Sequence, residues 1–285
     1  MLRQMIRMEC RKAFRNKMFY IAVAAGCIIT LFALVYYIGI YQNELTMMQA
    51  DDVNPMHEAS GLFNFWIGGE PFSFGSAAYF FMFPLLTAIP YGWSYCGEKR
   101  SGYIRIAVVQ AGKKAYFLAK YTAVFLSGAL AMVIPLAFDF LLSALFFPAV
   151  MPSPVYCTST GVFYDSLMSM LYYTVPLLYV MIYLLIDFIF GGLIACISYA
   201  AACFVQYRVV AVILPLFFML AVHYLRQFVY ISPEVRYKEI SPMFFLRPVQ
   251  AAYPASFAVI FAEMAALFFV TFFLSVIWER KHEIY

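Results

Sequence analysis

The chain has 285 residues, of which 65% are hydrophobic and only 12% are charged, and its mean hydropathy is +0.82. Soluble domains are usually about half apolar and about a quarter charged, so an ordinary soluble enzyme is excluded. The formal net charge of +4 is too small to indicate nucleic-acid binding. Most of the chain is therefore expected to lie in a lipid bilayer, as a single transmembrane domain over residues 1–285.

Six apolar stretches are long enough to cross a hydrocarbon core of roughly 30 Å, which takes about 20 helical residues. In chain order they cover residues 18–41, 74–95, 115–147, 175–205, 209–228 and 255–278. Several of them contain a proline, including Pro90 in the second stretch and Pro135 in the third, and we expect kinks there. The sequence therefore predicts an all-α membrane protein with six transmembrane helices.

Basic residues are distributed unevenly between the two sides of these stretches. Fifteen of the 19 Lys and Arg residues lie in the N-terminal segment, around the connection after the second stretch, at Arg208 and near the C-terminus. The opposite side carries only Arg226, Arg236, Lys238 and Arg247. Cytoplasmic loops are enriched in Lys and Arg. We therefore expect a multi-pass protein of the cell membrane with both termini in the cytoplasm.

Residues 2–17 have the spacing of an amphipathic helix. Its apolar side chains are Leu2, Met5, Ile6, Cys10, Ala13 and Phe14. An i, i+4 stripe on another face consists of Arg3, Arg7, Arg11 and Arg15. We expect this helix to lie flat at the membrane surface, with its apolar side in the acyl boundary and its arginines near anionic headgroups. The alternative is that the arginines are only the flanking charges that orient the first span.

The connection between the second and third stretches contains a short apolar helix after Gly102. Its apolar residues are Ile104, Val108 and Ala111, with Ile106 and Val109 beside them. A short cytosolic helix with an exposed apolar edge and mixed charge fits the groove of a partner protein. The alternative is an interfacial helix that binds only lipid. The candidate docking residues are Glu98, Arg100, Gly102, Ile104, Arg105, Val108 and Lys113.

The order of these features resembles the permease subunits of type-2 ABC exporters, the ABC-2 permeases. The matching features are a basic helix with Glu9 and the string Lys12-Ala-Phe-Arg-Asn-Lys17, then Glu98, Ser101-Gly102, an apolar helix, Lys113-Lys114 and Lys120. The resemblance covers the whole chain in topology but only residues 2–17 and 95–120 in motif. Many relatives have a proline and a Ser-Arg pair before the third span, where this chain has Gln110-Ala-Gly-Lys-Lys.

This resemblance implies that residues 2–16 form an elbow helix and residues 99–112 a coupling helix that docks on a separate ATPase subunit. It further implies an exporter of two permeases, identical or homologous, and two ATPases, working by alternating access. The chain has no GxxxxGK[ST] phosphate loop. ATP and Mg²⁺ are therefore expected on the partner, and this chain is expected to be neither an enzyme nor a cofactor carrier.

Three acidic residues, Asp139, Asp187 and Glu263, lie within the expected spans. Carboxylates are costly in a membrane and usually face a bundle interior or a water-filled cavity, so these three are candidates for a substrate or proton path. The alternative is that they form hydrogen bonds between helices and serve packing. No metal site is expected, because the histidines are scattered over an outer loop, the fifth stretch and the tail.

Two outer connections have weaker patterns. The aromatic run at residues 62–67 is expected at the membrane surface, and residues 229–254 lie where some ABC-2 permeases have a short re-entrant segment. Taken with the resemblance, the sequence predicts an exporter subunit for an amphipathic or hydrophobic substrate, with peptide as the first guess and drug or lipid next. The rival hypotheses are a stand-alone ion-coupled transporter that uses Asp187 and Glu263, and a non-transporting membrane scaffold or sensor.

Overall fold

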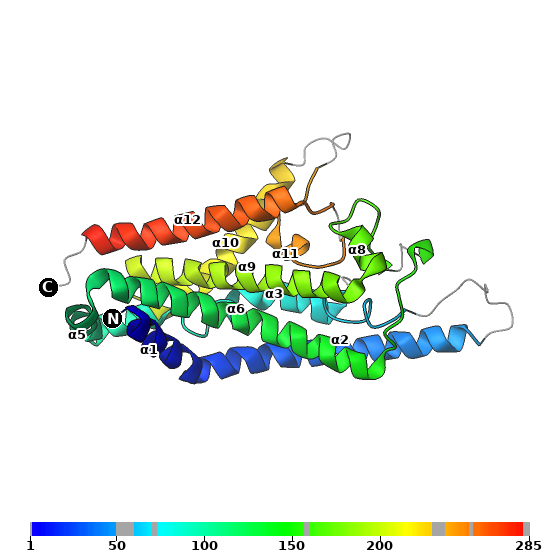
Figure 1. The fold of residues 1–285 in the computed structure, drawn as a ribbon, viewed down its shortest axis with the longest axis horizontal. Helices are drawn as coiled ribbons and strands as arrows, with labels where there is room; N and C mark the ends of the chain where they lie inside the picture. The colour runs from blue at the N-terminus through cyan, green and yellow to red at the C-terminus, as the bar shows by residue number, and fades with distance from the viewer. Residues whose placement is uncertain are drawn as a thin grey trace.

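The computed structural model describes residues 2–49, 60–69, 73–156, 160–229, 237–250 and 253–281, with residues 278–281 described by backbone only. Helices dominate, and no strand occurs among these residues. The long helices lie roughly side by side in an elongated bundle (Figure 1); they are α2 (Lys17–Met47), α6 (Lys113–Phe146), α9 (Pro176–Phe204), α10 (Arg208–Val229) and α12 (Phe257–Lys281). In the described part of the chain these five helices are long and apolar enough to cross a bilayer. The chain is an all-helical, multi-pass membrane protein.

The second expected span is interrupted. Residues 74–95 do not form one helix, because α3 (Phe74–Ala88) has only 15 residues and is followed by turns and then by α4 (Ser94–Arg100). Pro90 explains the break: it has no backbone N–H with which to continue the helical hydrogen bonds. The side-chain amide of Asn16 donates a hydrogen bond to the Pro90 carbonyl at 3.0 Å. By helix length, the described residues therefore contain five spans where the sequence predicts six.

Helix α9 lies inside the bundle and packs against α3, α6, α10 and α12. Of its most apolar stretch 67% is buried in the protein, against 39% for α6 and 17% for α10. Two glycines bring α6 and α9 close together. A Cβ at Gly128 would lie 2.3 Å from the Cβ of Ala195, and one at Gly191 would lie 2.8 Å from the Cβ of Met132. Because small residues let helix backbones approach closely, α6 and α9 form a tightly packed pair.

The aromatic run at residues 62–67 is buried, so the expectation that it lies at the membrane surface is wrong. Phe65, Trp66 and Ile67 are each at most 1% exposed and belong to the main apolar core. Asp139 of α6 accepts a hydrogen bond from the backbone N–H of Ile67 at 2.7 Å. The bundle can therefore bury this segment because the carboxylate satisfies one of its backbone groups.

The connection between α10 and α12 folds back against the bundle where the structure describes it. Short helix α11 (Pro242–Phe245) places the ring of Phe245 against Phe190 of α9, with the ring centroids 5.2 Å apart. Arg226 of α10 pairs with Glu239 at 2.9 Å. Residues 230–236 and 251–252, which also belong to the expected re-entrant segment, lie outside the described residues.

The two segments that the sequence singles out lie at one end of the bundle, which we call the basic end. Helices α1 (Leu2–Arg15), α4 and α5 (Tyr103–Ala111) are found there, together with the C-terminal end of α12 (Figure 1). Helix α8 (Ser169–Thr174) lies toward the opposite end, and η1 (Pro154–Tyr156) precedes it in the connection from α6 to α9, whereas α11 lies against the middle of α9. The fold thus brings residues 2–15 and 94–120 together.

Candidate functional site: a buried charge network at the basic end

Four charged side chains meet where α1, α4 and α6 come together. The ammonium of Lys120 lies 3.0 Å from the carboxylate of Glu9 and 2.8 Å from that of Glu98. The ammonium of Lys12 lies 2.8 Å from Glu9 and 3.6 Å from Glu98. The side chains of Lys120 and Glu9 are fully buried. We call Glu9, Lys12, Glu98 and Lys120 the charge network; its two positive and two negative groups balance each other.

Tyrosine hydroxyls supply further hydrogen bonds to the charge network. The hydroxyl of Tyr91 donates to Glu9 at 2.8 Å and accepts from Lys120 at 3.0 Å. The hydroxyl of Tyr116 donates to Glu98. A buried charge costs several kcal/mol unless it is paired and hydrogen-bonded. These contacts explain how α6 can carry a buried lysine inside an apolar helix.

The charge network keeps Glu9 and Lys12 ionised. Burial alone raises the pKa of Glu9, but the positive charges of Lys120 and Lys12 and their hydrogen bonds outweigh it, so the pKa lies below its ordinary value. Burial alone lowers the pKa of Lys12, but the hydrogen bond that its ammonium donates to Glu9 and the negative charges of the nearby carboxylates outweigh this effect and raise the pKa above its ordinary value. Both side chains are therefore charged at neutral pH.

Helix α1 packs against the protein with the face that the sequence assigns to lipid. Met5 and Ala13 are buried in an apolar cluster with residues of α4, α5 and α6, and Ile6 and Cys10 pack against that cluster. The expectation that this face enters the acyl boundary is therefore wrong for the residues that the cluster holds. The cause is Glu9, which lies on the same face and pairs with Lys120 of α6. The arginine stripe of Arg3, Arg7, Arg11 and Arg15 is exposed.

Two glycines shape the hairpin that α4, α5 and the start of α6 form. Gly102, between α4 and α5, has a φ of 72°, and Gly112, between α5 and α6, has a φ of 84°. Residues with a side chain rarely adopt this left-handed region. The turn at Gly102 places the ring of Tyr103 beneath the ammonium of Lys12, which lies 3.8 Å from the ring centroid. The hairpin is thus attached to α1 as well as to α6.

The exposed apolar residues of α5 are not Ile104, Val108 and Ala111, which the sequence analysis places on the apolar edge. Ile104 is 4% exposed and packs inside the protein, so its assignment to an exposed apolar edge is wrong. Ile106 and Val109 are 58% and 86% exposed. The reason is that Ile104 and Ala107 belong to the buried apolar cluster that α5 forms with α1, α4 and α6. The outward face of α5 therefore presents Arg105, Ile106 and Val109.

The other predicted docking residues occupy different places around the hairpin. Glu98 belongs to the charge network, and Arg100 is exposed and donates a hydrogen bond to the backbone carbonyl of Gln206 at 3.1 Å. Val108 and Lys113 are half-buried. These residues lie on one hairpin but do not form one continuous surface.

The three intramembrane acids have different surroundings. Asp139 is buried and holds the 62–67 segment, which favours a packing role. Glu263 is half-buried in α12. Asp187 in α9 is 1% exposed, and neither of its carboxylate oxygens has a hydrogen-bond partner among the described residues. Of the three, Asp187 is therefore the one whose surroundings least resemble a packing role.

The sequence prediction missed Lys12, Tyr91, Tyr116 and Lys120 as members of a site. A usable signal was present: Glu9 falls on the apolar face of the N-terminal helix, and Lys120 lies within the third apolar stretch. Charges at positions expected to be buried are stable only when paired. That rule predicts that Glu9 and Lys120 have partners, although it does not say which.

The charge network links three separate helices. No group of three or more His, Cys, Asp or Glu side chains that could hold a metal ion occurs in the described ranges. The charge network joins three helices, and removing one partner of a buried ion pair typically costs about 3–5 kcal/mol. We therefore expect α1, the hairpin and the start of α6 to move as one unit.

Comparisons with known proteins do not assign the chain to a family. No protein-family model matches it, and no curated protein matches it. The resemblance to ABC-2 permeases therefore rests on the order of its elements and on two loose motifs.

Proposed function

We propose that the chain is the membrane-spanning subunit of an ATP-driven exporter of the ABC-2 type. The observation that carries this proposal is the charge network, which joins the expected elbow helix and the expected coupling hairpin to α6 through Glu9, Glu98 and Lys120. A partner that binds the hairpin can then move α6 directly. The chain carries no phosphate loop of its own, so the energy comes from a separate ATPase.

In this proposal α5 is the docking element. Its outward face presents Arg105, Ile106 and Val109, an apolar pair beside a positive charge. An ATPase groove that accepts this face pulls on the hairpin when two ATPases close around ATP. The close contact of Gly128 with Ala195 passes the movement from α6 to α9, and the bundle changes between inward-open and outward-open states.

The orientation follows from the distribution of charge. The basic end carries α1, the hairpin and the end of α12, and cytoplasmic segments are enriched in Lys and Arg. We therefore place this end in the cytoplasm of a cell, at the plasma membrane. Both termini then lie on one side, so α3 together with the turns that follow it makes the sixth crossing.

The cargo we propose is amphipathic or hydrophobic, with peptide first and drug or lipid next. Support comes from a groove of 620 Å³ between α6, α9 and α12 whose lining includes Phe125, Phe261, Phe268 and Phe272. Its walls are almost entirely apolar. Moving apolar groups from water into this groove lowers their free energy, whereas a hydrophilic solute would lose its hydration without a compensating contact.

The test is capture of the ATPase from native membranes with a tagged chain. We expect a co-purifying protein that contains a phosphate loop and hydrolyses ATP, encoded near this chain. The double variant Ile106→Asp/Val109→Asp places charges in the docking surface and is expected to reduce capture at least tenfold. A matched control is Tyr207→Asp, which changes a 67% exposed residue at the same end of the bundle.

Two outcomes contradict the proposal. Capture that survives the double variant contradicts docking through α5. Transport by the purified chain alone in vesicles, driven by a proton gradient and lost in Asp187→Asn, instead supports the ion-coupled transporter.

A further inference from the structure

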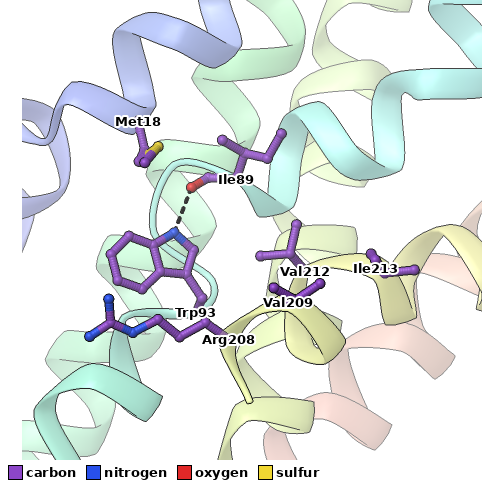
Figure 2. A pocket seen from close by; sticks show the side chains of 7 residues that line it. All are labelled: Met18, Ile89, Trp93, Arg208, Val209, Val212 and Ile213. Carbon is purple, nitrogen blue, oxygen red and sulfur yellow. Dashed lines mark hydrogen bonds between the residues drawn. The ribbon is translucent and has the colours of Figure 1, made fainter.

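A second recess at the basic end lies apart from the charge network. It is a pocket of 300 Å³ bounded by the start of α2, the break between α3 and α4, and the start of α10 (Figure 2). Its lining residues are Met18, Ile89, Trp93, Arg208, Val209, Val212 and Ile213. All of the described lining residues except Arg208 are uncharged, so the pocket combines apolar walls with one cation.

The guanidinium of Arg208, an exposed residue, contacts the edge of the pocket. It lies over the ring of Trp93, 4.8 Å from the ring centroid, and the indole N–H of Trp93 donates a hydrogen bond to the carbonyl of Ile89 at 2.9 Å (Figure 2). Gly97 leaves room for it, because a Cβ there would lie 2.9 Å from Nη2 of Arg208. The cation is therefore held beside the pocket.

No carboxylate neutralises Arg208 within the described part of the chain. The ion pairs there involve other basic residues, and Glu98, the nearest acid along α4, is engaged by Lys120. The first turns of α2, α4 and α10 contain no acidic residue. A ligand with a negative head and an apolar tail is complementary to this combination of charge and wall.

We propose that the pocket binds an anionic phospholipid from the leaflet at the basic end. Its phosphate contacts the Arg208 guanidinium, and part of one acyl chain lies against Met18, Val209 and Ile213. Pockets for small ligands have volumes of about 300–1,000 Å³. This pocket lies at the lower end of that range, so it holds part of the phospholipid and not the whole molecule. Free phosphate would leave the apolar walls unused. This proposal does not depend on the exporter function and can fail while that function holds.

Trp93 provides a direct readout for the test. The full-length protein is placed in phosphatidylcholine nanodiscs that contain either acyl-brominated phosphatidylglycerol or acyl-brominated phosphatidylcholine, and the quenching of tryptophan fluorescence is measured. The Trp93→Phe variant supplies the background from the other tryptophans. We expect the anionic lipid to quench Trp93 at about one fifth of the concentration of the zwitterionic lipid, the preference expected for one basic side chain at the membrane surface.

Variants distinguish lipid binding in this pocket from a general attraction of anionic lipids to the basic end of the protein. Arg208→Gln should abolish the preference, while Arg105→Gln, which removes an exposed arginine of α5 at the same end, should leave it unchanged. If Arg208→Gln disturbs folding, Gly97→Ala displaces the guanidinium and keeps its charge, and it should also reduce the preference. Equal quenching by the two lipids, or a preference that survives both variants, would overturn the proposal.

Discussion

Lys120 is a lysine with a fully buried side chain inside an apolar helix. Hydration of the ammonium group favours an exposed lysine. In the folded protein the carboxylates of Glu9 and Glu98 balance its charge instead, at 3.0 and 2.8 Å from the ammonium nitrogen. Charged residues are seldom fully buried unless they are paired. At the residue scale, therefore, the stability of the basic end depends on a balance of charge within a few ångströms.

Replacing Lys120 tests this balance. Lys120→Met leaves Lys12 as the one positive charge beside Glu9 and Glu98, and we expect the free energy of unfolding to fall by about 3–5 kcal/mol. Chemical denaturation of the protein in detergent micelles measures it. Lys114→Met, at an exposed position of the same helix, is the control and should change stability by less than about 0.5 kcal/mol.

The double variant Lys120→Met/Glu9→Gln should recover part of the loss, because it removes the uncompensated carboxylate. Two results would show that the charge network does not hold the helices together. One is an equal loss of stability in Lys120→Met and Lys114→Met, and the other is a double variant that is less stable than Lys120→Met.

The charge network also predicts a pH dependence. The pKa of Glu9 lies below its ordinary value of 4.5 in the folded protein, so its stabilisation is present above pH 4.5 and is lost as pH falls through the lowered value. The pKa of Lys12 lies above its ordinary value of 10.5, so its contribution is present below pH 10.5 and is lost as pH rises through the raised value. We expect the stabilisation to be constant between these limits.

The melting temperature measured against pH for the protein and for Glu9→Gln checks this expectation. The difference between the two should be constant near neutral pH and should shrink below pH 4.5. Other buried carboxylates cancel in the difference because both proteins contain them. A difference that grows with acidity would contradict the assigned role of Glu9.

At the scale of elements, the hairpin is held by its attachment to α1 and α6 and by its turns. Ile104 and Ala107 pack inward, while Ile106 and Val109 point away. Helix α5 is only nine residues long, so it depends on packing rather than on its own helical stability. The conformation of the Gly102 turn therefore decides how well the docking face is presented.

Gly102→Ala should loosen the hairpin. The φ of 72° is costly for a residue with a Cβ, by roughly 1–2 kcal/mol, and nothing lies within 4 Å of the new methyl group to compensate. Hydrogen exchange of the α5 amides should accelerate by at least several-fold. Gly39→Ala is the control, since Gly39 lies in α2 with nothing within 4 Å of an added Cβ and without a positive φ; it should not change exchange in α5.

At the scale of the whole molecule, the bundle has a basic end that carries α1 and the C-terminal end of α12, and an opposite end toward which α8 lies (Figure 1). If the basic end is cytoplasmic, the two ends must differ in their access to reagents added to intact cells. The exposed residues Arg3 and Arg105 represent the basic end and Tyr164 the other.

Single cysteines at these three positions, in a chain whose six native cysteines are replaced, test the orientation with a membrane-impermeant maleimide. Tyr164→Cys should react in intact cells, whereas Arg3→Cys and Arg105→Cys should react only after permeabilisation. Reaction of Arg3 and Arg105 variants from opposite sides would exclude a crossing by α3, and the reverse pattern would invert the proposed orientation.

Sequence patterns predict the long helices well, because each needs only local apolar length. They fail at Pro90, where the loss of one backbone donor ends α3, and at Trp66, which the sequence places at the membrane surface and the fold buries. For the candidate site, the helix of Arg3 to Arg15 and the hairpin were both predicted, but Ile104 was placed on the wrong face. Periodicity reveals that a helix has an apolar face; it does not reveal which neighbour covers it.

Amino-acid composition and the spacing of apolar and basic residues alone determine that this chain is helical, enters a membrane and concentrates its positive charge near one set of connections. The tertiary structure alone decides that Glu9, Glu98 and Lys120, up to 111 residues apart, form one network, and that Ile106 and Val109 remain exposed. The physical reason is range: hydrophobic length and helical periodicity act within about 20 to 30 neighbouring residues, whereas the pairing of buried charges depends on how distant helices pack.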